Sequence, residues 1–175
     1  RTTVAAQSEK PSPYDVAIRG ARIVDGSGNP WYRGDVYLNG GAIAAIDIAH
    51  REYPAKKTID GKGLVLAPGF IDLLGQSEYN VLVDPRAASK ITQGITTEVT
   101  GEGESIAPND EKMFREAEPT WKRYGVRADF LTLADYVARF AKTPPAINLG
   151  TLVGSGGLRQ LVVGGENRRA TPAEV

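Results

Sequence analysis

The chain has 175 residues, and its 21 basic side chains balance its 21 acidic ones at a pI near 6.8. This balance gives no electrostatic reason to expect nucleic acid or an anionic membrane as a partner, and no apolar run reaches the roughly 18 residues of a transmembrane helix. Cysteine is absent, which excludes disulfides and thiolate ligands, and the single histidine, His50, leaves little imidazole for a metal or acid–base site.

The first twelve residues are polar, rich in Ala, Ser and Thr, and show no periodicity. They predict a flexible tail over residues 1–12. Within it, Thr3-Val-Ala-Ala-Gln7 is similar to the remnant of a signal-peptide cleavage region, which favours a periplasmic or secreted protein over a cytoplasmic one.

Residues 13–67 carry short β-type patterns separated by glycine-rich turns. Tyr14–Asp25 predicts two short strands joined at Gly20. Two hairpins are predicted next. The first turns at Asn39-Gly40-Gly41 between the strands Asp35–Leu38 and Ala42–Ile48. The second turns at Gly61-Lys62-Gly63 between the strands Lys57–Asp60 and Leu64–Ala67. We therefore expect a small all-β unit, part of a β-sandwich domain, over residues 13–67.

Residues 68–175 alternate between strand and helix patterns. The expected strands are Phe70–Leu74, Ile95–Thr100 and Ala146–Val153. The expected helices are Pro85–Gln93 with Asp84 as N-cap, Asn109–Tyr124 with a break at Pro119, and Leu133–Lys142 capped by Thr132. A glycine-rich turn, Gly154–Gly157, follows the last strand.

This order predicts an α/β fold in which parallel strands are joined by right-handed crossovers. A complete (β/α)8 TIM barrel takes about 250 residues, so residues 68–175 supply the first β/α units of an incomplete barrel. Thr171-Pro-Ala-Glu174 has the residues of a helix start. It indicates that the C-terminal portion of the same precursor, as a separate chain, is the partner of this one.

The ends of the first two barrel strands carry the candidate site. With a period of two, Asp72, Leu74 and Gln76 share one face, and Glu98 and Glu102 share another. In an α/β barrel, side chains at the carboxyl ends of the strands face the active site. Glu102 is therefore predicted to point into the same cavity as Gln76, while Glu98 is also a candidate for an internal ion pair.

Several motifs together resemble the N-acyl-D-amino-acid deacylase (D-aminoacylase) branch of the amidohydrolase superfamily. They are Tyr14-Asp-Val-x-Ile-Arg-Gly, Gly28-Asn-Pro-Trp31, Ala67-Pro-Gly-Phe-Ile-Asp72, Asp84-Pro-Arg-Ala-x-Ser-Lys90, Gly94-Ile-Thr-Thr97 and Leu152-Val-Gly154. The departures matter as much as the matches. Leu74 and Gln76 stand at the positions of the family's His-x-His pattern. The family's cysteine after the second strand is missing here, and Glu102 falls at its place or next to it. Ser155 stands where the family commonly has a histidine.

The resemblance implies a metal-dependent hydrolase that cleaves the amide of N-acyl-D-amino acids or related small amides. A metal-bound water, of lowered pKa, would be the nucleophile. Zinc is the expected ion, with one or two divalent ions bound, and Glu102 is the candidate ligand. The candidates for the substrate pocket are Gln76, Glu78, Glu104, Ser155 and Arg159. The remaining histidine ligands and the catalytic residues are expected beyond Val175.

Three alternatives stay open. The same fold could hydrolyse a dipeptide or another cyclic or aryl amide. The loss of histidines at positions 74 and 76 also suits a catalytically inactive homologue that binds a ligand or partner. A homo-oligomer is compatible with either.

Overall fold

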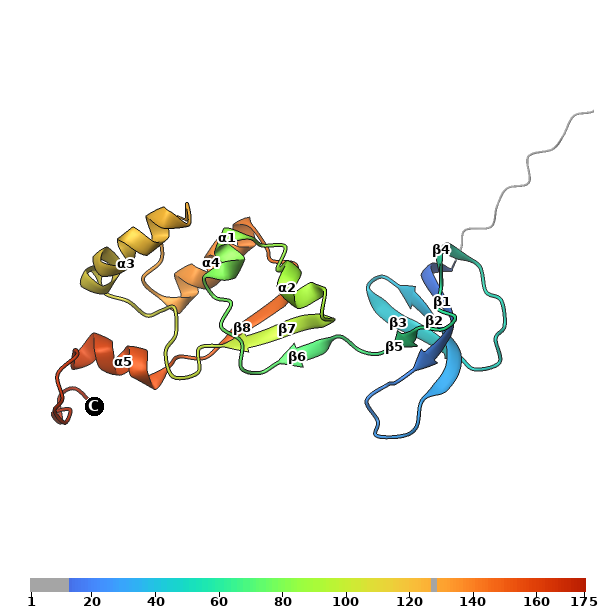
Figure 1. The fold of residues 1–175 in the computed structure, drawn as a ribbon, viewed down its shortest axis with the longest axis horizontal. Helices are drawn as coiled ribbons and strands as arrows, with labels where there is room; N and C mark the ends of the chain where they lie inside the picture. The colour runs from blue at the N-terminus through green and yellow to red at the C-terminus, as the bar shows by residue number, and fades with distance from the viewer. Residues whose placement is uncertain (1–12, 127–128) are drawn as a thin grey trace, which may run out of the picture. The chain divides into compact units, whose positions relative to one another are not determined.

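The structure, a computed structural model, describes residues 13–126 and 129–175 and divides the chain into two units, one ending at Pro68 and one starting at Gly69 (Figure 1). The predicted tail over residues 1–12 lies outside the described residues, and the localisation inferred from it stays a prediction. None of the helices in the described part of the chain combines the length and apolar character that crossing a bilayer requires.

The first unit is a single five-stranded sheet in the order β3-β2-β1-β4, with β5 pairing beside β4 on the edge of β1. Its strands are β1 (Tyr14–Ile23), β2 (Tyr32–Asn39), β3 (Ala42–Asp47), β4 (Ala55–Asp60) and β5 (Val65–Leu66). The hairpin predicted around Asn39–Gly41 is confirmed as β2 and β3. Tyr37, fully buried, packs against the rings of Tyr14 and Tyr53.

Two predictions for this unit are wrong. Residues 14–23 form one strand instead of two, because Gly20, with φ of 71°, makes a bulge that lets β1 continue. The segments on either side of Gly61–Gly63 do not form a hairpin, because both pair in parallel with β1. Strand β4 pairs with the part of β1 before its bulge, and β5 pairs with the part after it. Gly61 permits this course because a side chain there would meet Ala21 and the Arg19 carbonyl at 2.9 Å.

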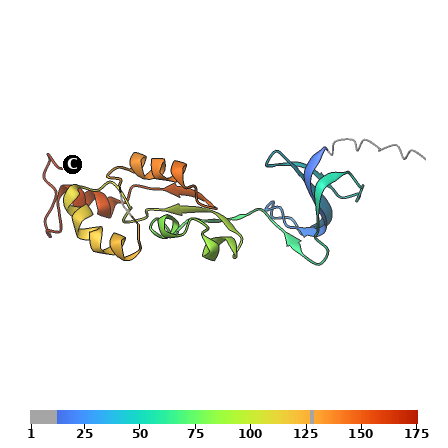
Figure 2. The same ribbon diagram turned by 90° about the horizontal axis from the view of Figure 1, so that it is seen from above.

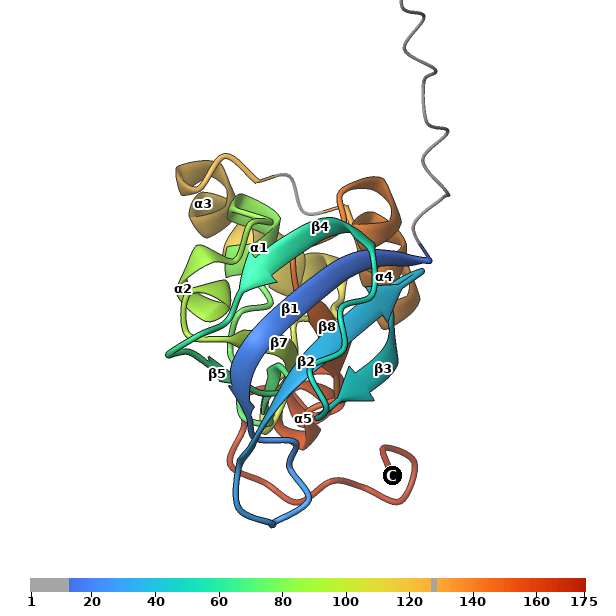
Figure 3. The same cartoon turned by 90° about the vertical axis from the view of Figure 1, so that its right-hand side faces the viewer.

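The second unit is a three-stranded parallel sheet in the order β6-β7-β8, with β6 and β8 as its edges. The strands are β6 (Phe70–Asp72), β7 (Ile95–Thr100) and β8 (Asn148–Thr151), and the helices are α1 (Asn80–Val83), α2 (Ala88–Ile91), α3 (Glu111–Arg123), α4 (Leu133–Lys142) and α5 (Ser155–Val162). Parallel strands joined by helices confirm the predicted α/β class. Helices α1, α2 and α4 lie on one side of this sheet (Figures 1 and 3).

An aromatic core joins the helices to the sheet. Phe130 is 2% exposed and packs edge-on against Trp121, Tyr136 and Phe114. Toward the carboxyl ends of the strands lie α3 and α5 (Figures 1 and 2).

Three predictions for this unit, two for helices and one for a turn, need correction. Asp84 does not cap a helix over residues 85–93, because its carboxylate accepts from Arg86 N and pairs with the Arg86 guanidinium, and α2 begins only at Ala88. Pro119 does not interrupt α3. The predicted turn at 154–157 instead starts α5, with Gly154 as N-cap. By contrast, the capping box of Thr132 and Asp135 on α4 is confirmed.

Candidate active site

A hollow of about 300 Å³ opens where β6 and β7 end. It is lined by Leu74, Gly75, Gln76, Glu78, Tyr79, Gly101, Glu102, Glu104, Ser105 and Ile106. The structure therefore brings together four of the predicted site residues, Gln76, Glu78, Glu102 and Glu104, from two segments about 25 residues apart in sequence.

Glu78 is the most constrained of these four residues. It is 6% exposed, and its Oε1 accepts a hydrogen bond of 3.0 Å from the backbone N–H of Gly101. Its carbonyl oxygen accepts from the buried Tyr136 hydroxyl at 2.9 Å. Because α4 supplies that hydroxyl, the helix layer and the loop after β7 both fix the position of Glu78.

Glu102 and Glu104 lie on the opposite wall, in the loop after β7. Both side chains are exposed, and neither carboxylate makes a hydrogen bond or ion pair within residues 13–126 and 129–175. The loop turns back on itself through the bond from Glu104 N to Glu102 O, 3.0 Å long. Their carboxylates are therefore free to meet a ligand.

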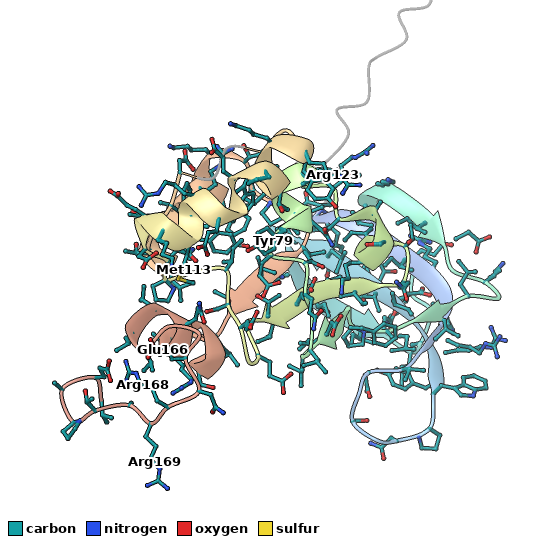
Figure 4. The ribbon with its side chains drawn as sticks, turned by 60° about the vertical axis from the view of Figure 1, so that its left-hand side comes forward. Tyr79, Met113, Arg123, Glu166, Arg168 and Arg169 are labelled. Carbon is teal, nitrogen blue, oxygen red and sulfur yellow. The ribbon has the colours of Figure 1, made fainter. Side chains whose placement is uncertain are left out.

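The hollow has a negative potential. Three carboxylates line it, and no Lys, Arg or His is among its lining residues. Burial first, and then the charges of Glu78 and Glu104, raise the pKa of the Tyr79 hydroxyl. The Tyr79 ring is anchored on Trp121, with ring centroids 4.6 Å apart, close to α3 (Figure 4). Such a wall attracts cations and repels a free carboxylate.

Asp72 and Glu98 do not face this hollow, contrary to the prediction from strand alternation. They are cross-strand partners, and both contact Lys90 on α2: Nζ lies 2.7 Å from Asp72 Oδ2 and 3.3 Å from Glu98 Oε1. The internal ion pair predicted for Glu98 is thus confirmed. The hydrogen bond from Lys90 lowers the pKa of Asp72, and the bond to Asp72 is the main cause that raises the pKa of Lys90.

Ser155 and Arg159 do not line the hollow. Both belong to α5, and the Arg159 guanidinium donates to the carbonyl oxygens of Glu166 and Arg168. Figure 4 shows Glu166 and Arg168 together in this C-terminal segment, where Arg168 also pairs with Glu174 at 2.8 Å. Arg159 therefore holds the C-terminal segment in this structure, and its assignment to substrate stays a prediction.

The hollow does not by itself fit the zinc centre that the family resemblance implies. Leu74 offers no lone pair, Gln76 offers an amide oxygen, and the others are carboxylates, so the donors are hard oxygens without an imidazole. Among the described residues, no three His, Asp or Glu side chains are grouped closely enough to hold a metal ion. Glu102 can supply one ligand, and a complete centre needs donors from elsewhere.

Besides the glycines Gly75 and Gly101, three lining residues were not predicted. Tyr79, Ser105 and Ile106 complete the walls. The motif Ser105-Ile-Ala-Pro108 was visible in the sequence, but nothing in it showed that Ser105 would turn its hydroxyl toward the loop, where it donates to the Ala107 carbonyl and accepts from Gly154 N.

Several known proteins whose matches cover more than nine-tenths of this chain are deacylases or aminoacylases. The chain is 38% identical over 173 residues to an N-acyl-D-aspartate deacylase of Alcaligenes xylosoxydans xylosoxydans, covering 95% of this chain and 33% of that protein. It matches the structure of an N-acyl-D-glutamate deacylase of Bordetella bronchiseptica, complexed with zinc and a phosphonate inhibitor, with a TM-score of 0.79, 33% identity and coverage of 92% and 34%.

A third match is a D-aminoacylase described as defining a subset of the amidohydrolases, with a TM-score of 0.77, 32% identity and coverage of 93% of this chain and 34% of that one. No family model matches the chain. The chain spans about a third of the length of the relatives it matches.

Proposed function

Since the chain is homologous, over nearly all of its length, to about a third of the deacylase group of barrel-fold amidohydrolases, we propose that the complete protein is an amidohydrolase. Its reaction is the hydrolysis of the amide C–N bond of N-acyl-D-amino acids or related small amides. The observation that carries this proposal is the hollow at the carboxyl ends of β6 and β7, which gathers Gln76, Glu78, Glu102 and Glu104 at the position where barrel enzymes act.

The residues of this chain would bind and orient the substrate. The Gln76 amide is a hydrogen-bond donor at the rim, suited to an acyl or peptide carbonyl oxygen, whereas the Ser105 hydroxyl already donates to the Ala107 carbonyl. The three glutamates disfavour a second carboxylate in this part of the site, so substrates with neutral or basic side chains fit it better than acidic ones. The catalytic base is expected outside this chain.

We propose that the complete protein requires a divalent cation. When bound, such an ion would polarise the amide and lower the pKa of a water molecule. Glu102 is the residue of this chain proposed to bind it, since its carboxylate is exposed in the hollow and uncommitted within the described residues. Zinc, the expected ion, would take its imidazole ligands from the remainder of the protein.

The decisive experiment combines assay and metal analysis on the complete protein. We expect turnover of N-acetyl-D-amino acids, with neutral and basic side chains preferred over D-aspartate, and bound divalent metal in the purified enzyme. Glu102→Ala should reduce both activity and metal content about tenfold or more, because one of three or four ligands is lost. The matched control is Glu116→Ala, which removes an exposed carboxylate of α3 and should change neither.

The other outcomes are equally informative. Turnover of dipeptides without N-acyl-D-amino acids would move the protein to a dipeptidase-like activity on the same fold. Absence of both metal and turnover would support an inactive binding homologue and overturn the proposal. Unchanged metal content in Glu102→Ala would remove this residue from the centre.

A second experiment restores the imidazoles. The double variant Leu74→His, Gln76→His recreates the His-x-His pattern at the hollow, and we expect it to bind more zinc than the wild type. If zinc content is unchanged, the exit of β6 in this protein does not present these two positions to a metal ion.

We also propose that the C-terminal portion of the protein covers the second unit. Its parallel sheet has two open edges, and Ile71 and Leu73 on β6 and the turn after it are 62% and 73% exposed. Further β/α units would pair with these edges and bury the apolar side chains. Mass spectrometry of the purified protein would show whether this portion is a separate chain.

A further inference from the structure

A fully buried carboxylate lies behind the wall of the hollow. Glu98, in the middle of β7, has no exposed surface, and its Oε1 accepts a hydrogen bond of 3.1 Å from the backbone N–H of Ser77. The same oxygen lies 3.3 Å from Lys90 Nζ. Its Oε2 has no partner among the described residues. Burying a charge is costly unless it is paired and hydrogen-bonded, so the unpartnered Oε2 calls for an explanation.

Glu98 is interlocked with Gly75. A Cβ atom at position 75 would overlap the Glu98 carboxylate, so only glycine fits there. Gly75 also extends the pairing of the strands, with its N–H donating to Val99 O at 3.0 Å. The neighbours of Gly75 on either side, Leu74 and Gln76, line the hollow. The space that Glu98 occupies therefore dictates the course of the backbone that presents them.

Two reciprocal hydrogen bonds, each accepted by a glutamate carboxylate, join the segments that follow β6 and β7. Glu98 on β7 accepts the N–H of Ser77, which follows β6, and Glu78, which also follows β6, accepts the N–H of Gly101, which follows β7. These hydrogen bonds join residues 21 and 23 positions apart. Each bond ends beside a polar residue of the hollow: Ser77 follows Gln76, and Gly101 precedes Glu102.

We propose that Glu98 and Glu78 form a reciprocal clamp that positions Gln76 and Glu102 against each other, with Glu98 as its buried positioning residue. Lys90 balances the charge of Glu98 from the helix side. The clamp deepens the proposed function, since it holds the walls of the same hollow, but its geometry can be measured without any substrate.

The test measures amide hydrogen exchange at Ser77 and Gly101 in the complete protein. Glu98→Ala should speed exchange at Ser77 by about tenfold or more, because the N–H loses its acceptor, and exchange at Gly101 should also rise. Glu98→Gln retains a carbonyl oxygen for Ser77 and should keep most of the protection. Unchanged exchange at Ser77 in Glu98→Ala would overturn the proposal.

A pair of glycine variants keeps the test decisive if Glu98→Ala folds poorly. Gly75→Ala should lower Tm strongly, whereas Gly150→Ala on β8 is the matched control, since its added Cβ would meet only Val99 Cγ2 at 4.0 Å. In the double variant Gly75→Ala, Glu98→Ala the overlap is removed, so part of the lost Tm should return. Strictly additive effects would mean that the two positions are not interlocked.

Activity separates the clamp from the proposed function. If the wild type hydrolyses N-acyl amides, Glu98→Ala should lower kcat/KM well beyond Gly150→Ala, and Glu98→Gln should restore most of it. Equal activity of Glu98→Ala and wild type would overturn the positioning role. If the wild type hydrolyses none of these substrates, the proposed function fails, while hydrogen exchange still decides on the clamp.

Discussion

Both units bury carboxylates, and Asp47 in the first unit differs in its use from Glu98 and Glu78 in the second. In the first unit, Asp47 is 4% exposed. Its carboxylate accepts hydrogen bonds from the backbone N–H groups of Ala49 and Arg51, which follow it by two and four residues, and it pairs with the Arg51 guanidinium. In the second unit, Glu98 and Glu78 accept N–H groups more than twenty residues away, on separate strand exits. Asp47 closes a local turn, whereas the two glutamates hold two walls of a hollow in place.

The difference also shows in the use of the oxygen atoms. Both oxygens of Asp47 are hydrogen-bonded, while Glu98 leaves Oε2 without a partner within the described residues. A carboxylate whose two oxygens both accept hydrogen bonds from its own turn stabilises that turn. A buried carboxylate with an unpartnered oxygen carries a desolvation cost that its own hydrogen bonds do not offset. Buried charge alone therefore does not mark a functional residue, and the range and completeness of its contacts are better guides.

The largest effect is expected when the local carboxylate is removed. Asp47→Ala leaves the N–H groups of Ala49 and Arg51 without their acceptor, and we expect the Tm of the first unit to fall by about 10 °C. Asp47→Asn keeps one acceptor and should lose less. Thermal unfolding followed by hydrogen exchange, which resolves the two units, would check this. A loss confined to the second unit would contradict the assignment of Asp47 to a local turn.

A smaller effect is expected at the long-range contacts. Tyr136→Phe removes the hydroxyl that donates to the Glu78 carbonyl, at a cost of about 1 kcal/mol in the free energy of unfolding. Since Glu78 is held from this side by that one bond, the exchange of the Gly101 amide should also rise. Denaturant unfolding and hydrogen exchange measure the two effects. A loss of stability without faster exchange at Gly101 would mean that Tyr136 does not support the clamp.

The smallest effect is expected from acid. Hydrogen bonds from Arg51 and Lys90 lower the pKa values of Asp47 and Asp72, so each carboxylate stabilises the folded state above its unfolded pKa of about 3.9. That contribution is lost as the pH falls below about 4 through the lowered values. Asp47→Asn should reduce this acid loss in the first unit, where Asp15 and Asp25 with their lowered pKa values remain, and leave it unchanged in the second. An equal change in both units would show that the two titrations are not separate.

Local patterns in the sequence predicted much of the fold. The hairpin at Asn39–Gly41, the strand Ile95–Thr100 and the capped helix after Thr132 depend on contacts within a few residues, and all three are confirmed. The motif resemblance located the two strand exits, and four of the six proposed site residues line one hollow. The sequence did not predict the parallel pairing of β4 and β5 with β1. The residues within a strand do not specify which distant strand it pairs with.

What the sequence determined by itself is the identity of the parts: an α/β chain without cysteine, with one histidine, and with leucine and glutamine at the two positions where the resemblance implies metal-binding histidines. What only the tertiary structure decided is the direction of the glutamates. Strand alternation assigned Glu98 and Glu102 to one face, yet Glu98 turns to Lys90 on α2 and Glu102 lines the hollow. The reason is physical: β7 ends at Thr100 and Gly101 takes a φ of 84°, so the alternation of the strand does not extend to Glu102, while α2 supplies the lysine that pairs with Glu98.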